Sequence, residues 1–485
     1  YQISNLIGGE VINTSDNSNE RDLNLDTFGF DWGWKRSGEI KDWSKLVILN
    51  SRKEKIYYQQ CAGIELWKSL DASKQIYESN KNYVSNNIDA CFHIGVKSNK
   101  ISWHPPVLWI GIGCERNTST EFIKVSLEKL LKSKGLSLLS IAGIASVILK
   151  RDENSILELS KDNDWPIQFF SAEELDKVPV PNPSSIVLRE IGTSSVAEAS
   201  SLLAAGKGAN LIHEKTIFKN DRYGAVTFAI SKSMKQFAPS KGEIHIVGSG
   251  PGDLSFLTSD AKKALSKCTV WLGYKLYLDL IQDLKRVDQV RIDSEITEER
   301  SRCEQAISLA QEGVKVALIS SGDAGIYGMG GLILELLQNT KQQFRPSFEI
   351  HPGISSMQMA ASLSGAPLMN DFCAISLSDK LTEWEEIENR IKGALVGDFV
   401  VVIFNPQSRK RDWQLKKTIE LFLEFRKKDT PVLLARQVGR QNQTKKFYNL
   451  SNLPISEIDM FSLLIIGNSK TKLVDDIFIT PRGYL

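Results

Sequence analysis

The sequence has few of the residues that build metal sites or disulfide frameworks. Its 485 residues include six cysteines and five histidines, and these are scattered along the chain without a C-x-x-C pair. Dispersed cysteines are typical of free thiols in a reducing compartment. We therefore predict a cytoplasmic protein with no disulfide framework and no metal site, and a structural role for His351, which precedes Pro352.

Long apolar runs and blocks of like charge are also absent. No apolar run reaches the roughly 18 residues that a membrane-spanning helix requires. The formal charge of +2 is spread along the chain rather than gathered in a basic block. These absences argue against a membrane span and against a nucleic-acid-binding surface, so we expect a small-molecule partner.

Length and composition indicate several domains. A chain of 485 residues exceeds what one compact core holds, so two to four domains are expected. The polar segment 232–242, interrupted by Pro239 and Gly242, has the composition of a linker. We predict an N-terminal region over 1–105, a small α/β domain over 106–236, a linker at 237–242 and an α/β part over 243–485, with subdomains at about 243–355 and 356–470.

Strand-like runs alternate with amphipathic helical patterns, which predicts an α/β fold. In the small domain we expect a strand at Val107–Ile112 and a helix at Thr120–Lys134, and the segment IVLREIGTSSVAEASSLLAAG (186–206) predicts the same order of strand, turn and helix. Trp32, Trp34 and Trp43 are expected to pack in a core. The strands expected after residue 242 are Ile244–Gly248, Thr269–Leu272, Val314–Ser320, Phe348–His351, Cys373–Leu377, Phe399–Phe404, Val432–Ala435 and Leu463–Gly467, and the helices are Ala261–Cys268, Glu298–Gln311, Tyr327–Leu337, Glu383–Ala394 and Leu415–Arg426.

The segment GEIHIVGSGPGDLSFLT (242–258) is a strong local signal for a ligand. Its glycines follow a strand in the pattern G-x-G-x-G, whereas a dinucleotide-binding turn needs G-x-G-x-x-G and an acid at the end of the next strand. Pro251 also removes one backbone donor. A nicotinamide cofactor is therefore disfavoured, although an NAD-dependent oxidoreductase stays as a remote alternative. The absence of Gly-Lys-Ser/Thr excludes a phosphate-binding P-loop.

Three further loops follow predicted strands: SSGDAGIYGMGG (320–331), HPGISSMQMAASLSG (351–365) and the end of VVVIFNP (400–406). Open α/β sheets bind ligands at the carboxyl ends of their strands. Together the four loops predict a site that holds a polar, nucleoside-sized ligand mainly through backbone contacts. Ser355 and Ser356 fit either ligand binding or helix capping, and both readings stay open.

These loops resemble those of the tetrapyrrole methylases. Within that family, GYKLYLDLI (273–281) and GAPLMNDFCAISLSDKLTEWEEIENRI (365–391) resemble the enzymes that methylate C17 of precorrin-3B. Asn370 stands where a histidine is expected. The resemblance implies two α/β subdomains around a cleft, S-adenosylmethionine as methyl donor, a precorrin or cobalt-precorrin substrate, ring contraction, and a homodimer formed through the methylase half.

The resemblance also implies the site residues. Asp253 and Tyr274 are the candidates for proton transfer during ring contraction. The residues that would line the cofactor site are Pro251, Ser321, Gly322, Asp323, Ile326, Tyr327, Ser355, Ser356, Phe404 and Val438.

The region before residue 237 resembles cobalt-precorrin-5A hydrolase, whose C-terminal domain matches residues 106–236. The matching segments are GIGCERNTSTEFI (111–123), the stretch over 169–206, and YGAVTFAISKS (223–233), while residues 1–105 resemble the end of that enzyme's other domain, without its front. In the first turn Glu115 and Asn117 replace an arginine and a glycine. Candidates for binding a carboxylate at helix starts are Arg116, Thr118, Ser119, Glu190, Thr193 and Ser195, with Lys215 as a further acid–base candidate.

The combined prediction is a fused corrin-synthesis protein. The C-terminal half would methylate C17, and the N-terminal half would open the lactone that ring contraction creates. Two alternatives stay open: methylation at another carbon of the macrocycle, and an N-terminal half that binds without catalysis.

Overall fold

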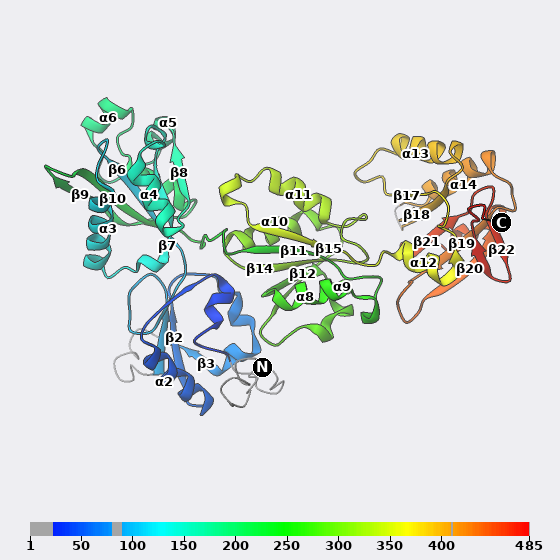
Figure 1. Ribbon diagram of the computed structural model, residues 1–485, viewed down its shortest axis with the longest axis horizontal. Coiled ribbons are helices and arrows are strands. Elements are labelled where there is room, and N and C mark those ends of the chain that lie inside the picture. The colour runs from blue at the N-terminus through cyan, green and yellow to red at the C-terminus, as the bar shows by residue number, and fades with distance from the viewer. Residues whose placement is uncertain (1–22, 80–89, 409–410, 485) are drawn as a thin grey trace.

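The computed structural model describes residues 23–79, 90–408 and 411–484, which form four α/β units in succession, each built on a five-stranded sheet (Figure 1). No helix in these ranges is long and apolar enough to cross a membrane.

The first unit has a core dominated by tryptophan. Trp32, Trp34 and Trp43 are buried, as the sequence predicts, together with Trp67 and Trp103. Its sheet has the order β1-β5-β4-β2-β3. The elements are β1 (Lys35–Ser37), α2 (Ile40–Ser51), β2 (Ile56–Gln60), β3 (Ile76–Glu78), β4 (Cys91–Ile94) and β5 (Ser102–His104), with short 3₁₀ helices η1 (Phe28–Trp32), η2 (Leu66–Ser69) and η3 (Asp71–Gln75).

The second unit is a sheet of order β8-β7-β6-β10-β9, in which β6, β7 and β8 are parallel and β10 is antiparallel to both of its neighbours. Its strands are β6 (Leu108–Cys114), β7 (Ile141–Val147), β8 (Ile167–Phe170), β9 (Asn210–Asn220) and β10 (Gly224–Lys232). Its helices are α3 (Thr120–Lys134), α4 (Asn154–Asn163), α5 (Ala172–Asp176), α6 (Ser185–Ile191) and α7 (Ala197–Ala205), with 3₁₀ turns η5 (Leu138–Ser140) and η6 (Ile148–Lys150).

The strand predicted at residues 186–191 is wrong, because this segment is helix α6. Ser184 caps the helix, with its side chain accepting a hydrogen bond from the Val187 amide, and Gly192 ends it in a left-handed conformation. A short apolar run fits a strand and a helix equally well, and here the cap decides between them.

The third unit is a fully parallel sheet of order β13-β12-β14-β11-β15. Its order places the ends of β14, β11 and β15 side by side. The strands are β11 (Glu243–Gly248), β12 (Val270–Tyr274), β13 (Val290–Ser294), β14 (Lys315–Ser320) and β15 (Ser347–His351). The helices are α8 (Ser259–Lys267), α9 (Lys275–Leu280), α10 (Glu299–Gln311) and α11 (Gly330–Gln338), with 3₁₀ turns η7 (Leu254–Phe256), η8 (Gln282–Leu284) and η9 (Gln342–Phe344).

The fourth unit is a mixed sheet of order β17-β18-β21-β19-β20, accompanied by a small sheet of order β16-β23-β22. With the third unit it makes the pair of α/β subdomains that the sequence predicts (Figure 1). The helices are α12 (Ser356–Ser364), α13 (Trp384–Val396) and α14 (Trp413–Phe425), with 3₁₀ turns η10 (Leu450–Asn452) and η11 (Ile455–Glu457). The strands are β16 (Gly365–Ala366), β17 (Phe372–Ser376), β18 (Val400–Phe404), β19 (Pro431–Arg436), β20 (Thr444–Asn449), β21 (Ser462–Ile466), β22 (Lys472–Val474) and β23 (Ile477–Ile479).

The segment between the second and third units is packed rather than free. The Gln236 side chain is buried; its Oε1 accepts hydrogen bonds from Trp34 Nε1 at 2.7 Å and the Ile64 amide at 3.1 Å, and its Nε2 donates to the Trp32 carbonyl at 2.6 Å. Nε2 also donates to the carbonyl of Glu312 in the third unit. One side chain therefore joins the first unit to the third.

Candidate functional site

Three loops of the third unit meet at the carboxyl ends of adjacent strands. The backbones of Gly250 and Gly322 exchange hydrogen bonds of 3.1 and 2.8 Å, which joins the loop after β11 to the loop after β14. A Cβ on Gly248 would lie 2.7 Å from both the Gly322 carbonyl oxygen and the Gly353 nitrogen. Only glycine permits this approach of three main chains, so they form one continuous backbone surface.

Asp323 fastens two of these loops together. Its Oδ2 accepts a hydrogen bond of 3.0 Å from the Gly353 amide, and its Oδ1 accepts one of 2.8 Å from the Gly325 amide. An ionised carboxylate has about four acceptor positions, so both oxygens keep capacity for a further donor. Asp323 therefore shapes the loops and can still receive an amine or hydroxyl group.

The serines of the third loop differ in their roles. Ser355 is buried and is the N-cap of α12; its hydroxyl accepts from the Met357 amide while Gln358 reaches back to the Ser355 amide. Capping, one of the two readings left open, is thus the role that Ser355 has here. Ser356 is the first residue of the helix, and its amide faces a Cβ built on Gly322 at 3.9 Å.

Tyr327 links the two subdomains. Its hydroxyl donates to the Ala374 carbonyl of β17 at 2.9 Å, and its ring lies 5.1 Å from that of Phe404 at the end of β18. Its φ of 51° is in the left-handed region, which is uncommon for a bulky residue. Because 54% of the residue is exposed, the ring remains available to a ligand.

The loop after β19 supports the first glycine loop. The Asp253 amide donates to the Gly439 carbonyl at 2.7 Å, and a Cβ on Gly439 would lie 2.6 Å from Pro251 Cγ. Val438 is buried in the core of the fourth unit. Pro251 and Val438, far apart in the sequence, are therefore brought to neighbouring loops, while Ser321 and Ile326 lie half-buried in the loop between β14 and α11.

The two candidates for proton transfer have separate surroundings. Asp253 caps its own turn, where its Oδ1 accepts from the Ser255 amide at 2.8 Å, and hydrogen bonding from Ser255 lowers the pKa of Asp253. This carboxylate is ionised at neutral pH, so it supplies a charge rather than a proton, and its lowered pKa also makes it a weaker proton acceptor. The Tyr274 ring packs edge-on against Tyr277 at 5.1 Å.

Arg440 is a residue that the sequence reasoning missed. Its Nε donates to the Pro251 carbonyl at 3.3 Å, and burial lowers its pKa, an effect opposed by the nearby Tyr277 hydroxyl. Burial also raises the pKa of Tyr277, which the Arg440 cation counteracts. A half-buried guanidinium beside the glycine loop is suited to a ligand carboxylate. The available signal was its position just after a predicted strand, at the same sheet end as the other loops.

The candidates in the first turn of the second unit are engaged locally. Arg116 pairs with Asp152 at 2.7 Å and donates to the Leu149 carbonyl at 2.7 Å. Thr118 is buried and donates to main-chain carbonyls, and Ser119 caps α3. These side chains make the helix start rather than an open anion site.

The second turn shows a similar arrangement. Thr193 and Ser195 are buried. The Thr193 hydroxyl donates to the Ser195 carbonyl and accepts from the Ser195 amide. Glu190, by contrast, is exposed on α6. Lys215 Nζ donates to the Asn182 carbonyl at 2.6 Å. Glu198, which the sequence analysis did not single out, is fully buried and accepts from the Lys215 amide and from the amide and side chain of Asn182.

Two surface hollows lie away from the glycine loops. One of about 380 Å³ lies along β20 and includes Asp476, and the other, of about 320 Å³, lies between α3 and η5. We assign neither to the cofactor, because the convergent backbone and Asp323 lie elsewhere.

The geometry and the comparisons define the class of the molecule. Residues 243–454 match the family of tetrapyrrole (corrin/porphyrin) methylases, and residues 108–231 match the cobalamin synthesis G C-terminus. A Salmonella typhimurium protein named as a probable cobalt-factor III C(17)-methyltransferase is 44% identical over 241 residues, which is 50% of this chain and 99% of that protein. The chain therefore belongs to the tetrapyrrole methylases and carries an additional region that matches the cobalamin synthesis G C-terminus.

Two other relatives extend well beyond the region that matches this chain. The chain is 43% identical over 246 residues to the cobalt-factor III methyltransferase of Priestia megaterium, and this match is 50% of the chain but 45% of that protein. It is 39% identical to the Archaeoglobus fulgidus cobalamin biosynthesis protein CbiHC, over 51% of the chain and 54% of the relative. The chain thus spans about half the length of these two relatives. The solved structure of the methyltransferase CobJ is 32% identical, with 50% of this chain and 100% of that chain covered and a TM-score of 0.48.

Proposed function

We propose that the third and fourth units use S-adenosylmethionine to methylate C17 of a precorrin-3B-type tetrapyrrole, with or without cobalt, and that ring contraction accompanies this transfer. The observation that carries the proposal is the 44% identity over 99% of a relative named for C17 methylation. In the transfer the carbon–sulfur bond of the sulfonium breaks as the carbon–carbon bond forms, and the sulfur keeps the electron pair.

The glycine loops support the choice of donor. A sulfonium methyl is already activated, so its transfer requires alignment with a carbon nucleophile and exclusion of water more than acid–base help. The backbone surface of Gly248, Gly322 and Gly353 offers polar main-chain groups without charge. Asp323 is placed to accept from an amine or hydroxyl of the donor, and Tyr327 to cover it.

Arg440 supports the choice of substrate. Corrin precursors carry acetate and propionate side chains around the macrocycle, and a guanidinium binds a carboxylate through paired hydrogen bonds. Arg440 lies next to Pro251 and so borders the same loops. We infer that it holds one substrate carboxylate, while the Asp253 carboxylate supplies a negative charge beside the glycine loop.

For the second unit we propose a docking role without catalysis, in which the turn before α3 takes part neither in carboxylate binding nor in lactone hydrolysis. The specific observation is that Arg116 is already paired with Asp152, with Thr118 and Ser119 committed to the start of α3. Hydrolysis of a cobalt-precorrin-5A-type lactone remains the second candidate, since residues 108–231 match the cobalamin synthesis G C-terminus.

The test of the methyltransferase proposal begins with calorimetric titration of S-adenosylhomocysteine into the full chain. We expect one site per chain, weakened at least tenfold by Asp323→Ala and unchanged by Arg116→Ala. Incubation with S-adenosylmethionine and cobalt-factor III or precorrin-3B should then give a product heavier by one methyl group, located at C17 by NMR.

Different failures have different meanings. If the folded protein did not bind S-adenosylhomocysteine, the proposed methyl-donor site would be wrong. Binding with methylation at another carbon would keep the donor and overturn the C17 assignment. Loss of methylation in Arg116→Ala would contradict the division of labour between the two halves.

A further inference from the structure

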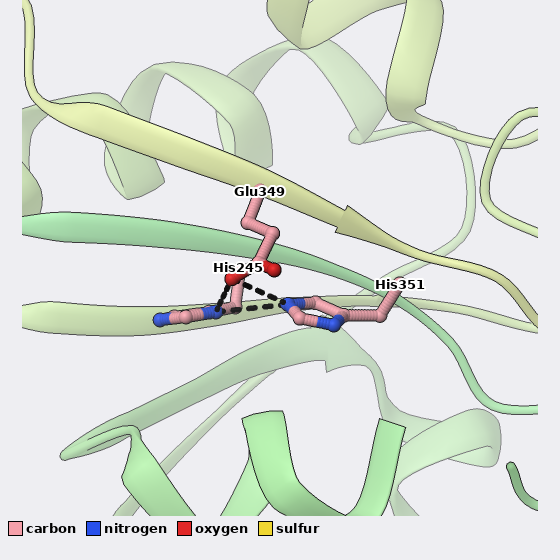
Figure 2. A group of neighbouring side chains, drawn as sticks. All are labelled: His245, Glu349 and His351. Atoms are coloured by element: carbon pink, nitrogen blue, oxygen red, sulfur yellow. Dashed lines mark hydrogen bonds and ion pairs between the residues drawn. The ribbon is translucent and has the colours of Figure 1, made fainter. Parts of the chain in front are cut away.

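Two histidines that are 106 residues apart meet in the third unit. His245 lies on β11 and His351 ends β15, and their rings stack with centroids 5.1 Å apart. His245 and His351 are scattered in the sequence but are neighbours in the fold. The parallel register places His245 opposite Glu349, and residues 349 and 351 share a face because side chains alternate along a strand. Figure 2 shows the three side chains pointing toward one another.

The atoms of this group are spaced like metal ligands. His245 Nδ1 and His351 Nε2 are 2.9 Å apart, and the Glu349 carboxylate lies 3.8 Å from the first and 3.7 Å from the second. Four-coordinate Zn²⁺ with bonds of about 2.0–2.2 Å separates its ligand atoms by about 3.3 Å. The observed distances bracket that value.

The outer nitrogen of each ring is held by a carboxylate. His245 Nε2 lies 3.0 Å from Glu243 Oε2, and His351 Nδ1 lies 2.7 Å from Asp260 Oδ2. A histidine that binds a metal usually donates its other N–H to such a partner, which fixes the ring and its tautomer. With both ring protons on the carboxylate side, Nδ1 of His245 and Nε2 of His351 present lone pairs to each other. In that tautomer the two lone pairs repel each other at this distance, and a metal ion or a proton between them removes the repulsion.

The site also has an entrance. Both histidines are buried, whereas the Glu349 side chain is 61% exposed. The ring nitrogens are therefore preorganised inside the unit, and the carboxylate lies at the side open to solvent. We propose that His245 Nδ1, His351 Nε2 and the Glu349 carboxylate bind one divalent transition metal of the Zn²⁺ class, with Glu243 and Asp260 as outer partners. Two imidazoles and one carboxylate suit Zn²⁺ better than the oxygen-preferring Mg²⁺ or Ca²⁺.

The test uses the full chain after removal of metal with a chelator. Titration with Zn²⁺ alone, followed by calorimetry and by metal analysis after dialysis, should give one tightly held metal per chain. Glu349→Gln should weaken this binding at least tenfold, and His351→Asn should abolish it. His213→Asn is the matched control, since it removes a histidine of β9 whose partner is the Thr216 hydroxyl.

Glu349→Gln decides the matter even if His351→Asn does not fold, because Glu349 is at the surface. It should leave S-adenosylhomocysteine affinity unchanged, so failure here is distinguishable from failure of the methyltransferase proposal. Absence of stoichiometric Zn²⁺ binding would overturn the proposal and leave a proton as the cation between the rings. Equal Zn²⁺ affinity in Glu349→Gln and the unaltered chain would overturn it as well.

Discussion

At the scale of single residues, Tyr327 combines a strained backbone with contacts on two subdomains. Its φ of 51° is maintained because the hydroxyl is held by the Ala374 carbonyl and the ring by Phe404. The effects of the ring and of the hydroxyl can be measured separately, because phenylalanine keeps the ring and lacks the hydroxyl.

We expect Tyr327→Ala to weaken S-adenosylhomocysteine binding at least tenfold, since both the aromatic contact and the hydrogen bond are lost. Tyr327→Phe should weaken it no more than about fivefold, because a neutral hydrogen bond contributes about 1 kcal/mol. Calorimetry measures both. Equal losses in the two variants would show that the hydroxyl, not the ring, carries the effect.

Glu312 is a buried carboxyl beside the packed linker, and burial raises its pKa. In the unfolded chain it titrates near 4.5, and below that pH it is protonated in both states and costs nothing. As the pH rises through the higher folded pKa, the folded state must bury a charge and loses stability. Glu312→Gln should therefore raise the urea midpoint at neutral pH and leave it nearly unchanged below pH 4.5. If the urea midpoints of Glu312→Gln and the unaltered chain differed by the same amount at every pH, burial of the Glu312 charge would not be the cause.

The residue scale also shows what the sequence could not supply. Asp323 lies in a loop after a predicted strand, and both Asp323 and Tyr327 are implied by the resemblance to the tetrapyrrole methylases, so their selection did not require the fold. The pair His245–His351 depends on which strands are neighbours, which no local pattern contains. For Arg440 the sequence held only one signal, its position after a predicted strand. The roles of the cofactor residues themselves stay predictions.

At the scale of elements, the strands and helices from β11 onward that have strong apolar periodicity were predicted well. Segments without it were missed, among them β13, β20 and β22, whose side chains are largely polar or exposed. The helix at Ser185–Ile191 was mistaken for a strand because its cap, rather than its period, determines its form. Apolar periodicity therefore predicts elements that bury one face, and it fails where local hydrogen bonds determine whether a segment forms a helix or a strand.

The convergence of loops at the glycines is an element-scale property with a clear test. Gly353→Ala would place a Cβ against the Gly322 carbonyl, so the loops must separate. We expect a loss of about 1–3 kcal/mol in the free energy of unfolding and a large loss of S-adenosylhomocysteine affinity. Urea unfolding and calorimetry measure the two effects.

Gly393→Ala is the matched control, because nothing lies within 4 Å of a Cβ built at this position of α13. It should stabilise the chain by up to about 1 kcal/mol through helix propensity and leave binding unchanged. Normal S-adenosylhomocysteine binding by Gly353→Ala would show that the close approach of the loops is not needed for the site.

At the scale of the whole molecule, the segment that joins the second and third units packs against both of them. Phe237 lies between Trp109 of the second unit and Phe344 of the third, with ring centroids 5.5 and 5.4 Å away. The cluster around Trp34 continues into Ile244 and Val316 of the third unit. The composition predicts a polar linker here, but the contacts of Gln236 and Phe237 depend on surfaces of other units that no local pattern reveals.

Gln236→Ala should lower the free energy of unfolding by about 2 kcal/mol or more, because the buried groups it satisfies in the first and third units lose their partner. Tryptophan fluorescence during urea unfolding reports the change. Gln343→Ala, which removes one exposed hydrogen bond to the Ile167 carbonyl, should stay within about 0.5 kcal/mol. If the two variants were equally stable, the hydrogen bonds of Gln236 would not stabilise the contact between the first and third units.

The packed linker also limits how the two halves can cooperate. A flexible tether would let one half swing toward the other with a bound ligand, but a connection held by Gln236 and Phe237 gives no such freedom. Movement of this segment therefore cannot carry a ligand from one half to the other. The fusion then has a different consequence: because one chain contains both halves, they are always made in equal amounts.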